Sequence, residues 1–158
     1  MSRKSVREGK NVYQLSREKA GLTRDAAAER LIYVTADRIE KIEYETSLPR
    51  PDEVLAMAKG YGNVSLCNHY CSHDCPIGRE YVPAVEVKDL SQITLEMLAN
   101  LNALEKEKNR LIEITVDGEI TADEMPDYLR IRKYLDQMEL TIESLKMWIE
   151  QNVNSDNL

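Results

Sequence analysis

The sequence lacks phenylalanine and has one tryptophan among its 158 residues. Its bulky core must therefore come from leucine, isoleucine, valine, methionine and the eight tyrosines. No apolar run approaches the ~20 residues that a membrane-spanning helix needs, so we expect no membrane partner. The basic first residues lead into no apolar stretch and show no secretory signal, so we expect a cytoplasmic protein.

Cysteine is scarce and unevenly placed. The three cysteines form an odd set and all lie between Cys67 and Cys75. An odd, clustered set does not suit a disulfide framework, and it indicates metal binding, redox chemistry or buried thiols.

Positive charge is in deficit, with 21 Lys+Arg against 28 Asp+Glu and a net charge of −7. Spread evenly, this charge would argue against nucleic acid, because lysine and arginine drive phosphate binding. Residues 1–88, however, carry 14 basic and 13 acidic residues, whereas residues 89–158 carry 7 and 15. We therefore expect an N-terminal domain at 1–78, a linker at 79–90, an acidic helical module at 91–152 and a disordered tail at 153–158.

Residues 11–60 predict short helices separated by tight connections. Thr23 and Thr35 stand where they can N-cap helices that begin at the next residue, and Pro51 suits the first turn of another helix. Two short capped helices joined by a tight turn are typical of the helix-turn-helix motif.

The sequence here resembles the lambda-repressor/Cro-like helix-turn-helix family. Residues 15–29 resemble the first two helices of that family, residues 34–43 its recognition helix, and residues 48–58 its fourth-helix segment. The resemblance covers about residues 11–66 and implies an all-α, five-helix DNA-binding domain that contacts double-stranded DNA.

The resemblance also implies which residues lie near DNA: Arg24, Thr35, Ala36, Asp37, Arg38 and Lys41. Arg38 is the best candidate for a base contact, because its planar fork matches guanine. Arg24 and Lys41 are expected to hold phosphate. A flexible basic arm would add Arg3, Lys4 and Arg7.

Several residues depart from the family pattern. Arg24 stands where the family usually has glutamine, and Tyr33 and Tyr44 stand where it has glycine, so the first turn cannot use glycine's positive φ at Tyr33. Asp37 and Glu40 place carboxylates on the expected groove side, where phosphate repels them although cytosine can donate to them.

The segment from Cys67 to Cys75 holds five metal-capable side chains in nine residues. If the helix ends near Ser72, Cys75 can fold back, and Pro76 favours that ending. The candidate ligands for zinc or an iron–sulfur cluster are Cys67, Cys71, Cys75 and His73, with His69 as an alternative to His73. Buried structural thiols and a reversible Cys71–Cys75 disulfide remain open.

Residues 91–152 predict a long antiparallel helical hairpin, coiled-coil-like, that turns at Asp117-Gly118. The expected first-helix seam is Met97, Leu101, Leu104, Lys108 and Leu111. The expected second-helix seam is Tyr128, Ile131, Leu135, Met138, Ile142, Leu145 and Ile149. Additional apolar residues indicate a second buried face, and we expect a homodimer through residues 91–152.

These patterns favour a sequence-specific DNA-binding transcriptional regulator that acts as a dimer. One alternative is a protein-interaction adaptor on a helix-turn-helix fold with little DNA affinity. Another is a regulator gated by metal or thiol chemistry at Cys67–Cys75. We do not expect an enzyme, because the sequence has no glycine-rich phosphate loop and no evident nucleophile with a base and an orienting acid.

Overall fold

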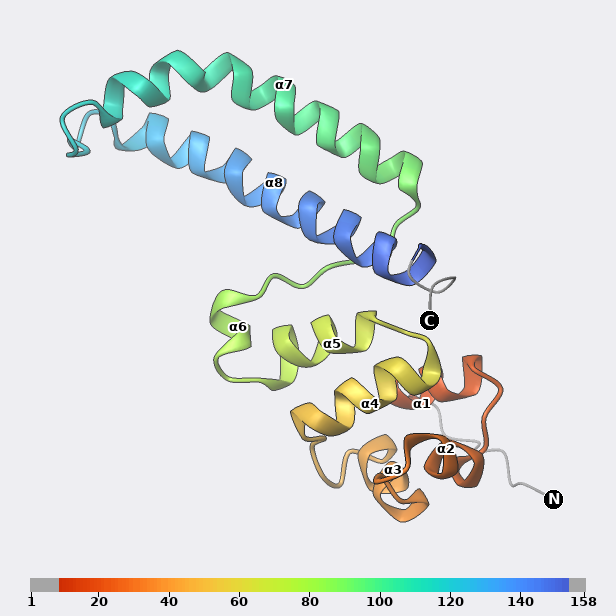
Figure 1. The fold of residues 1–158 in the computed structure, drawn as a ribbon. Coiled ribbons are helices and arrows are strands. Elements are labelled where there is room, and N and C mark those ends of the chain that lie inside the picture. Colours follow the sequence, from red (N-terminus) through yellow and green to blue (C-terminus); the bar gives the residue numbers. More distant parts are fainter. Residues whose placement is uncertain (1–8, 154–158) are drawn as a thin grey trace. The chain divides into compact units, whose positions relative to one another are not determined.

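A computed structural model describes residues 9–153 of the chain, and these residues form helices and no strand (Figure 1). The all-α class predicted from the sequence is confirmed for this part of the chain. The chain divides into two compact units, Met1–Ala84 and Val85–Leu158, each described separately below. The division falls inside the predicted linker at 79–90. No helix of the described residues is long and apolar enough to cross a membrane.

The first unit consists of short helices. They are α1 (Val12–Lys19), α2 (Arg24–Leu31), α3 (Ala36–Glu43), α4 (Pro51–Tyr61), α5 (Ser65–His69), the π-helix η1 (Tyr70–Asp74) and α6 (Gly78–Tyr81).

Side-chain caps fix where α1, α2 and α3 begin. Asn11 accepts a hydrogen bond from the backbone N–H of Gln14 at the start of α1. Thr23 and Thr35 accept from the third residue of α2 and of α3, which confirms the predicted caps. Pro51 is the first residue of α4, as predicted. These caps keep the connections short, so the helices can share one core.

The core of the first unit is built from small and aliphatic side chains with two tyrosines. Its buried members are Tyr13, Ala27, Leu31, Val34, Ile39, Ile42, Val54, Met57, Ala58, Tyr61 and Leu66. The fully buried Ala27 and the glycine at position 60 let α2 approach α4, since a Cβ at Gly60 would lie 2.4 Å from Cδ2 of Leu31. The close packing fixes α2 and α3 against the rest of the unit.

The second unit contains two long helices, α7 (Leu90–Thr115) and α8 (Met125–Asn152), which lie side by side and run antiparallel (Figure 1). The Asp89 side chain caps α7 by accepting a hydrogen bond from the backbone N–H of Gln92. Ile93 and Ile114 of α7 and Ile131 of α8 are buried between the helices. Asn100 donates from Nδ2 to Oγ1 of the buried Thr141 at 3.0 Å, which ties the two helices in register.

The seam between α7 and α8 agrees only in part with the predicted one. Ile131 is buried, and the predicted seam residues that are partly buried are Met97, Leu104, Leu111, Tyr128, Met138 and Leu145. Leu101 and Lys108 of the predicted α7 seam are exposed, and so are Leu135, Ile142 and Ile149 of α8. At each of these five positions the preceding residue faces inward instead. Two of those preceding residues are Asn100 and Thr141, whose hydrogen bond holds them between the helices. Those five seam assignments are therefore wrong by one residue of helix rotation, whereas Ile131 is confirmed.

Candidate nucleic-acid interface

The outer side of α3 carries exposed polar residues at its beginning. Thr35 and Asp37 are exposed, and Lys41 follows Asp37 by one helical turn. Lys41 Nζ lies 2.8 Å from Asp37 Oδ2. The opposite side of α3 places Ile39 and Ile42 in the core. An α3 that is buried on one side and polar on the other suits contact with a polar partner.

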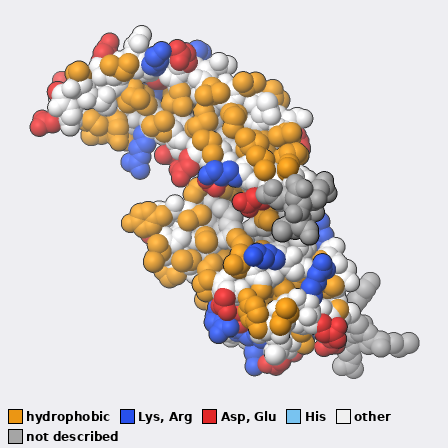
Figure 2. All heavy atoms as spheres, viewed as in Figure 1, with side chains coloured by type: hydrophobic (Ala, Val, Ile, Leu, Met, Phe, Trp, Pro, Cys, Tyr) orange, Lys and Arg blue, Asp and Glu red, His pale blue; other side chains and the backbone are white. Residues whose placement is uncertain are grey.

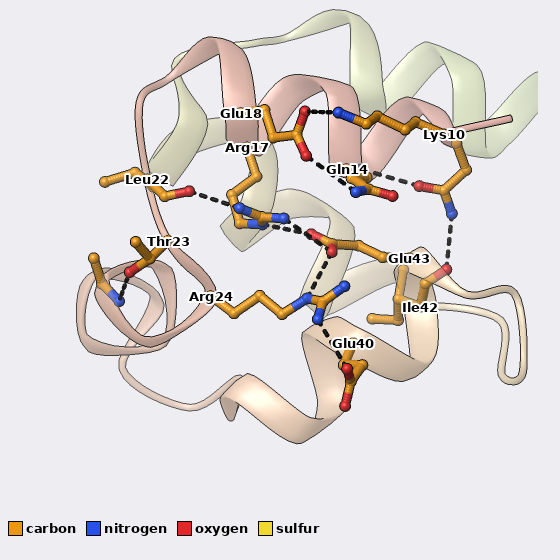
Figure 3. Close-up of polar contacts among 12 residues, drawn as sticks. Lys10, Gln14, Arg17, Glu18, Leu22, Thr23, Arg24, Glu40, Ile42 and Glu43 are labelled. Atoms are coloured by element: carbon orange, nitrogen blue, oxygen red, sulfur yellow. Dashed lines mark hydrogen bonds and ion pairs between the residues drawn. The ribbon is translucent and has the colours of Figure 1, made fainter. Parts of the chain in front are cut away.

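Arg24, at the first position of α2, binds two carboxylates of α3 (Figure 3). Its Nε donates to Glu43 Oε2 and its Nη1 donates to Glu40 Oε1, both at 2.8 Å. Its guanidinium carbon lies 4.9 Å from the centre of the Tyr44 ring. Glu43 is buried, while the Glu40 side chain is 46% exposed. Only the contact with Glu40 is open to exchange with an outside anion.

A buried ion pair lies next to Arg24 (Figure 3). Arg17 Nε lies 2.5 Å from Glu43 Oε1, and Arg17 Nη1 donates to the Leu22 carbonyl oxygen at 2.6 Å. The Arg17 side chain is 8% exposed and that of Glu43 is 1% exposed. Breaking such a pair costs about 3–5 kcal/mol, because the remaining charge is buried alone. The pair holds α1, the start of α2 and the end of α3 together.

Sequence reasoning missed Arg17 and Glu43. The sequence does carry a signal for both: each lies on the buried side of its helix, at the spacing of the apolar residues. A charged residue in such a position requires a partner of opposite charge.

Arg38 is held within the first unit. Its Nε donates to Glu53 Oε1 at 2.8 Å and its Nη2 to Glu53 Oε2 at 2.7 Å. It also donates to Ser47 Oγ at 2.6 Å and to the Leu48 carbonyl oxygen at 2.8 Å. The hydrogen bond from Arg38 lowers the pKa of Glu53. The structure thus places the sequence's best base-contact candidate between α3, the loop after it and α4.

The cations assigned to DNA share one property: each has a carboxylate partner within the first unit. Arg24 binds Glu40 and Glu43, Arg38 binds Glu53, and Lys41 binds Asp37. Thr35 and Ala36 lie beside them at the start of α3. The proposed arm residues 3, 4 and 7 lie outside the described residues. The local surface is therefore zwitterionic, and phosphate would have to compete with these carboxylates.

The turn between α2 and α3 has a strained backbone at an unexpected residue. Ile32 adopts φ 67 and ψ −52, and the Tyr33 N–H donates to the Leu31 carbonyl oxygen at 2.8 Å. This is a classic γ-turn, which is rare, and a β-branched residue is an outlier there. Among the described non-glycine residues, only Ile32 and Glu45 have positive φ. Ile32 precedes Tyr33 and Glu45 follows Tyr44, so the positive φ lies one residue away from each tyrosine.

The cysteine–histidine segment continues α5 into η1. Cys67 lies in α5, Cys71 and His73 lie in η1, and Cys75 follows in an extended conformation, as Pro76 predicts. The three cysteines are partly buried and are not joined to one another in a disulfide. Across residues 9–153, the structure brings no three cysteine, histidine or carboxylate side chains into an arrangement that could hold a metal ion. The four candidate ligands are therefore neighbours in sequence that this conformation does not join.

Other contacts anchor this segment. Tyr13 Oη donates to Asp74 Oδ2 at 2.9 Å, and the rings of His69 and His73 stack with centroids 4.4 Å apart. Gly78 packs on the Cys71 carbonyl, where a Cβ would lie 2.0 Å from the oxygen. Burial raises the pKa of Tyr13, so its hydroxyl stays protonated and donates. These contacts join α1, η1 and α6.

Comparison with known proteins yields no match. No protein-family model matches the chain, and neither does a curated protein or a solved structure. Function must therefore be inferred from the geometry above.

Proposed function

We propose that the chain is a cytoplasmic, sequence-specific DNA-binding transcriptional regulator of the helix-turn-helix type. The observation that carries the proposal is the pair α2–α3, in which Thr35 caps an α3 that is exposed along its outer side. An α-helix with its side chains is about 10–12 Å across, and the major groove is about 12 Å wide, so α3 can enter it.

In this proposal Thr35, Ala36, Asp37 and Lys41 face the groove. Lys41 can donate to guanine or to phosphate, and Asp37 can accept from the amino group of cytosine. The backbone N–H groups at the start of α3 favour a nearby phosphate.

Arg24 contributes by exchanging partners. Its bond to the buried Glu43 persists, while the half-exposed Glu40 gives way to a DNA phosphate. An exposed ion pair is worth about 0–1 kcal/mol, so this exchange requires little energy. Arg38 has a positioning role, since two of its hydrogen bonds join α3 to Glu53 of α4 and two hold the loop between these helices.

Selection of binding sequences from a random duplex library with the full chain tests the proposal. We expect an enriched motif, with an affinity that falls steeply with salt. Lys41→Ala should weaken binding, whereas Lys59→Ala, an exposed lysine on α4, should leave it unchanged. Glu40→Gln should strengthen binding up to about fivefold by freeing Arg24. If no sequence is enriched, the proposal is wrong.

A second candidate is a protein-interaction adaptor with little DNA affinity. Two observations favour it: the three cations expected at DNA are already paired, and Ile32 and Leu48 are 89% and 69% exposed. This candidate would be selected if the wild-type chain enriched no duplex and if Lys41→Ala bound duplex no differently from the wild type.

A further inference from the structure

Helix α8 presents an apolar residue every seven positions on a side that α7 leaves open. Leu135, Ile142 and Ile149 are 47%, 40% and 40% exposed. Met138 and Leu145 lie between them and are partly buried. A strict seven-residue repeat of aliphatic residues is the pattern by which one helix packs along another over several turns.

Helix α7 adds to the same side. Leu101 follows the inward-facing Asn100 by one residue, just as Ile142 follows the inward-facing Thr141. One residue is a rotation of about 100° about the helix axis. Because the helices are antiparallel, these two rotations turn toward the same side of the pair. We call this side the heptad face, and its exposed members are Leu101, Leu135, Ile142 and Ile149.

The heptad face is large enough for a stable contact. Helices of 26 and 28 residues are about 40 Å long, and two side by side are about 20 Å wide, which gives about 800 Å². A specific complex buries about 800 Å² on each partner. Figure 2 shows hydrophobic side chains gathered over the α7–α8 pair.

Charge is low on the α7 part of this face. From Leu90 to Leu104, α7 has a single charged residue, Glu96, which Lys88 neutralises at 2.8 Å. Charged pairs lie toward the end where α7 meets α8, as in Glu107–Arg130 and Asp127–Arg110, and near the C-terminal end of α8, as in Lys146–Glu143. The surface that covers this part of α7 must itself be aliphatic and helical, with the same repeat.

We propose that the heptad face is covered by the heptad face of a second copy of the chain, which forms a four-helix homodimer. The same surface then meets itself about a two-fold axis, so a repeat that is apolar on one copy is matched on the other. This association needs no DNA, and its test is therefore independent of the function proposed above.

Sedimentation equilibrium of the full chain without DNA, at micromolar concentration, tests the dimer. Ile142→Glu should raise the dimer dissociation constant at least about 100-fold, because two-fold symmetry places the change in the interface twice. The matched control is Leu140→Glu: Leu140 is 39% exposed, but it precedes Thr141 by one residue and so lies on the other side. The control should remain dimeric.

Circular dichroism checks that each variant keeps its helices. If Ile142→Glu loses helicity, the milder pair Leu135→Gln and Ile149→Gln decides the question in its place. A monomeric wild-type chain would overturn the proposal. So would equal weakening by Ile142→Glu and Leu140→Glu, because the contact would then not be specific to the heptad face.

Discussion

Replacing Ile32 with glycine should stabilise the first unit, although it deletes a large apolar side chain. Ile32 holds φ 67 and ψ −52 in the turn before α3, a conformation that a β-branched residue rarely adopts. Its side chain is 89% exposed, so the substitution removes little buried surface. Relief of the backbone strain should therefore change the free energy of unfolding more than loss of the buried side-chain surface does.

The magnitude follows from three terms. A residue in a sparsely populated backbone region is strained by about 1–3 kcal/mol, which glycine relieves. Burying a whole isoleucine side chain is worth about 1.5–3 kcal/mol, and only about a tenth of that is present at Ile32. Glycine also loses about 0.5–1 kcal/mol more conformational entropy on folding. The net effect is a stabilisation of about 1 kcal/mol.

Urea unfolding of the full chain, followed by circular dichroism, measures this change. Tyr33→Gly is the matched control: Tyr33 has no positive φ, and its hydroxyl donates to the Asp52 carbonyl oxygen at 2.8 Å, so the control should destabilise. A loss of stability in Ile32→Gly comparable to that in Tyr33→Gly would refute the strain argument.

Three further substitutions test the first unit. The Tyr61 hydroxyl is buried and finds no hydrogen-bond partner among the described residues, so Tyr61→Phe should raise the free energy of unfolding by about 1 kcal/mol in urea; destabilisation would contradict this. Arg38 lowers the pKa of Glu53, so the stability that the Glu53 carboxylate provides is complete above its pKa in the unfolded chain and is lost as pH falls through its pKa in the folded chain. The difference in the free energy of unfolding between wild type and Glu53→Gln should therefore shrink from about pH 5 to about pH 3. A constant difference would exclude this contribution. Gly78→Ala should destabilise the fold by about 1–3 kcal/mol. The loss should exceed that of Gly60→Ala, because a Cβ at position 78 meets the Cys71 backbone, whereas a Cβ at position 60 meets the end of the Leu31 side chain. Thermal melts that rank the two variants in reverse would be inconsistent with this packing.

Local chemistry made much of the fold predictable. Thr23, Thr35 and Pro51 act within one turn of their own positions, so the beginnings of α2, α3 and α4 follow from adjacent residues. The aliphatic periodicity likewise located α7 and α8. These signals depend on neighbours in sequence, which is why they could be used without a structure.

Contacts between distant residues could not be predicted in the same way. Arg38 and Glu53 are fifteen residues apart, and the pattern of α3 alone gives no reason to withdraw Arg38 from the groove. Five residues of the α7–α8 seam were misplaced because two apolar stripes lie next to each other on α8. The hydrogen bond between Asn100 and Thr141, which lie forty-one positions apart in the sequence, decides which stripe faces inward.

The carboxylates on α3 govern how this surface would select a partner. Asp37 and Glu40 each hold a cation that phosphate would otherwise attract, so they weaken contact with any DNA sequence alike. They can accept hydrogen bonds only where a donor such as the cytosine amino group is offered. Non-specific affinity falls for every duplex, whereas a matching duplex recovers part of the loss. Asp37→Asn should therefore increase binding to random duplex and reduce the ratio of specific to non-specific affinity; an unchanged ratio in competition titrations would show that Asp37 reads no base.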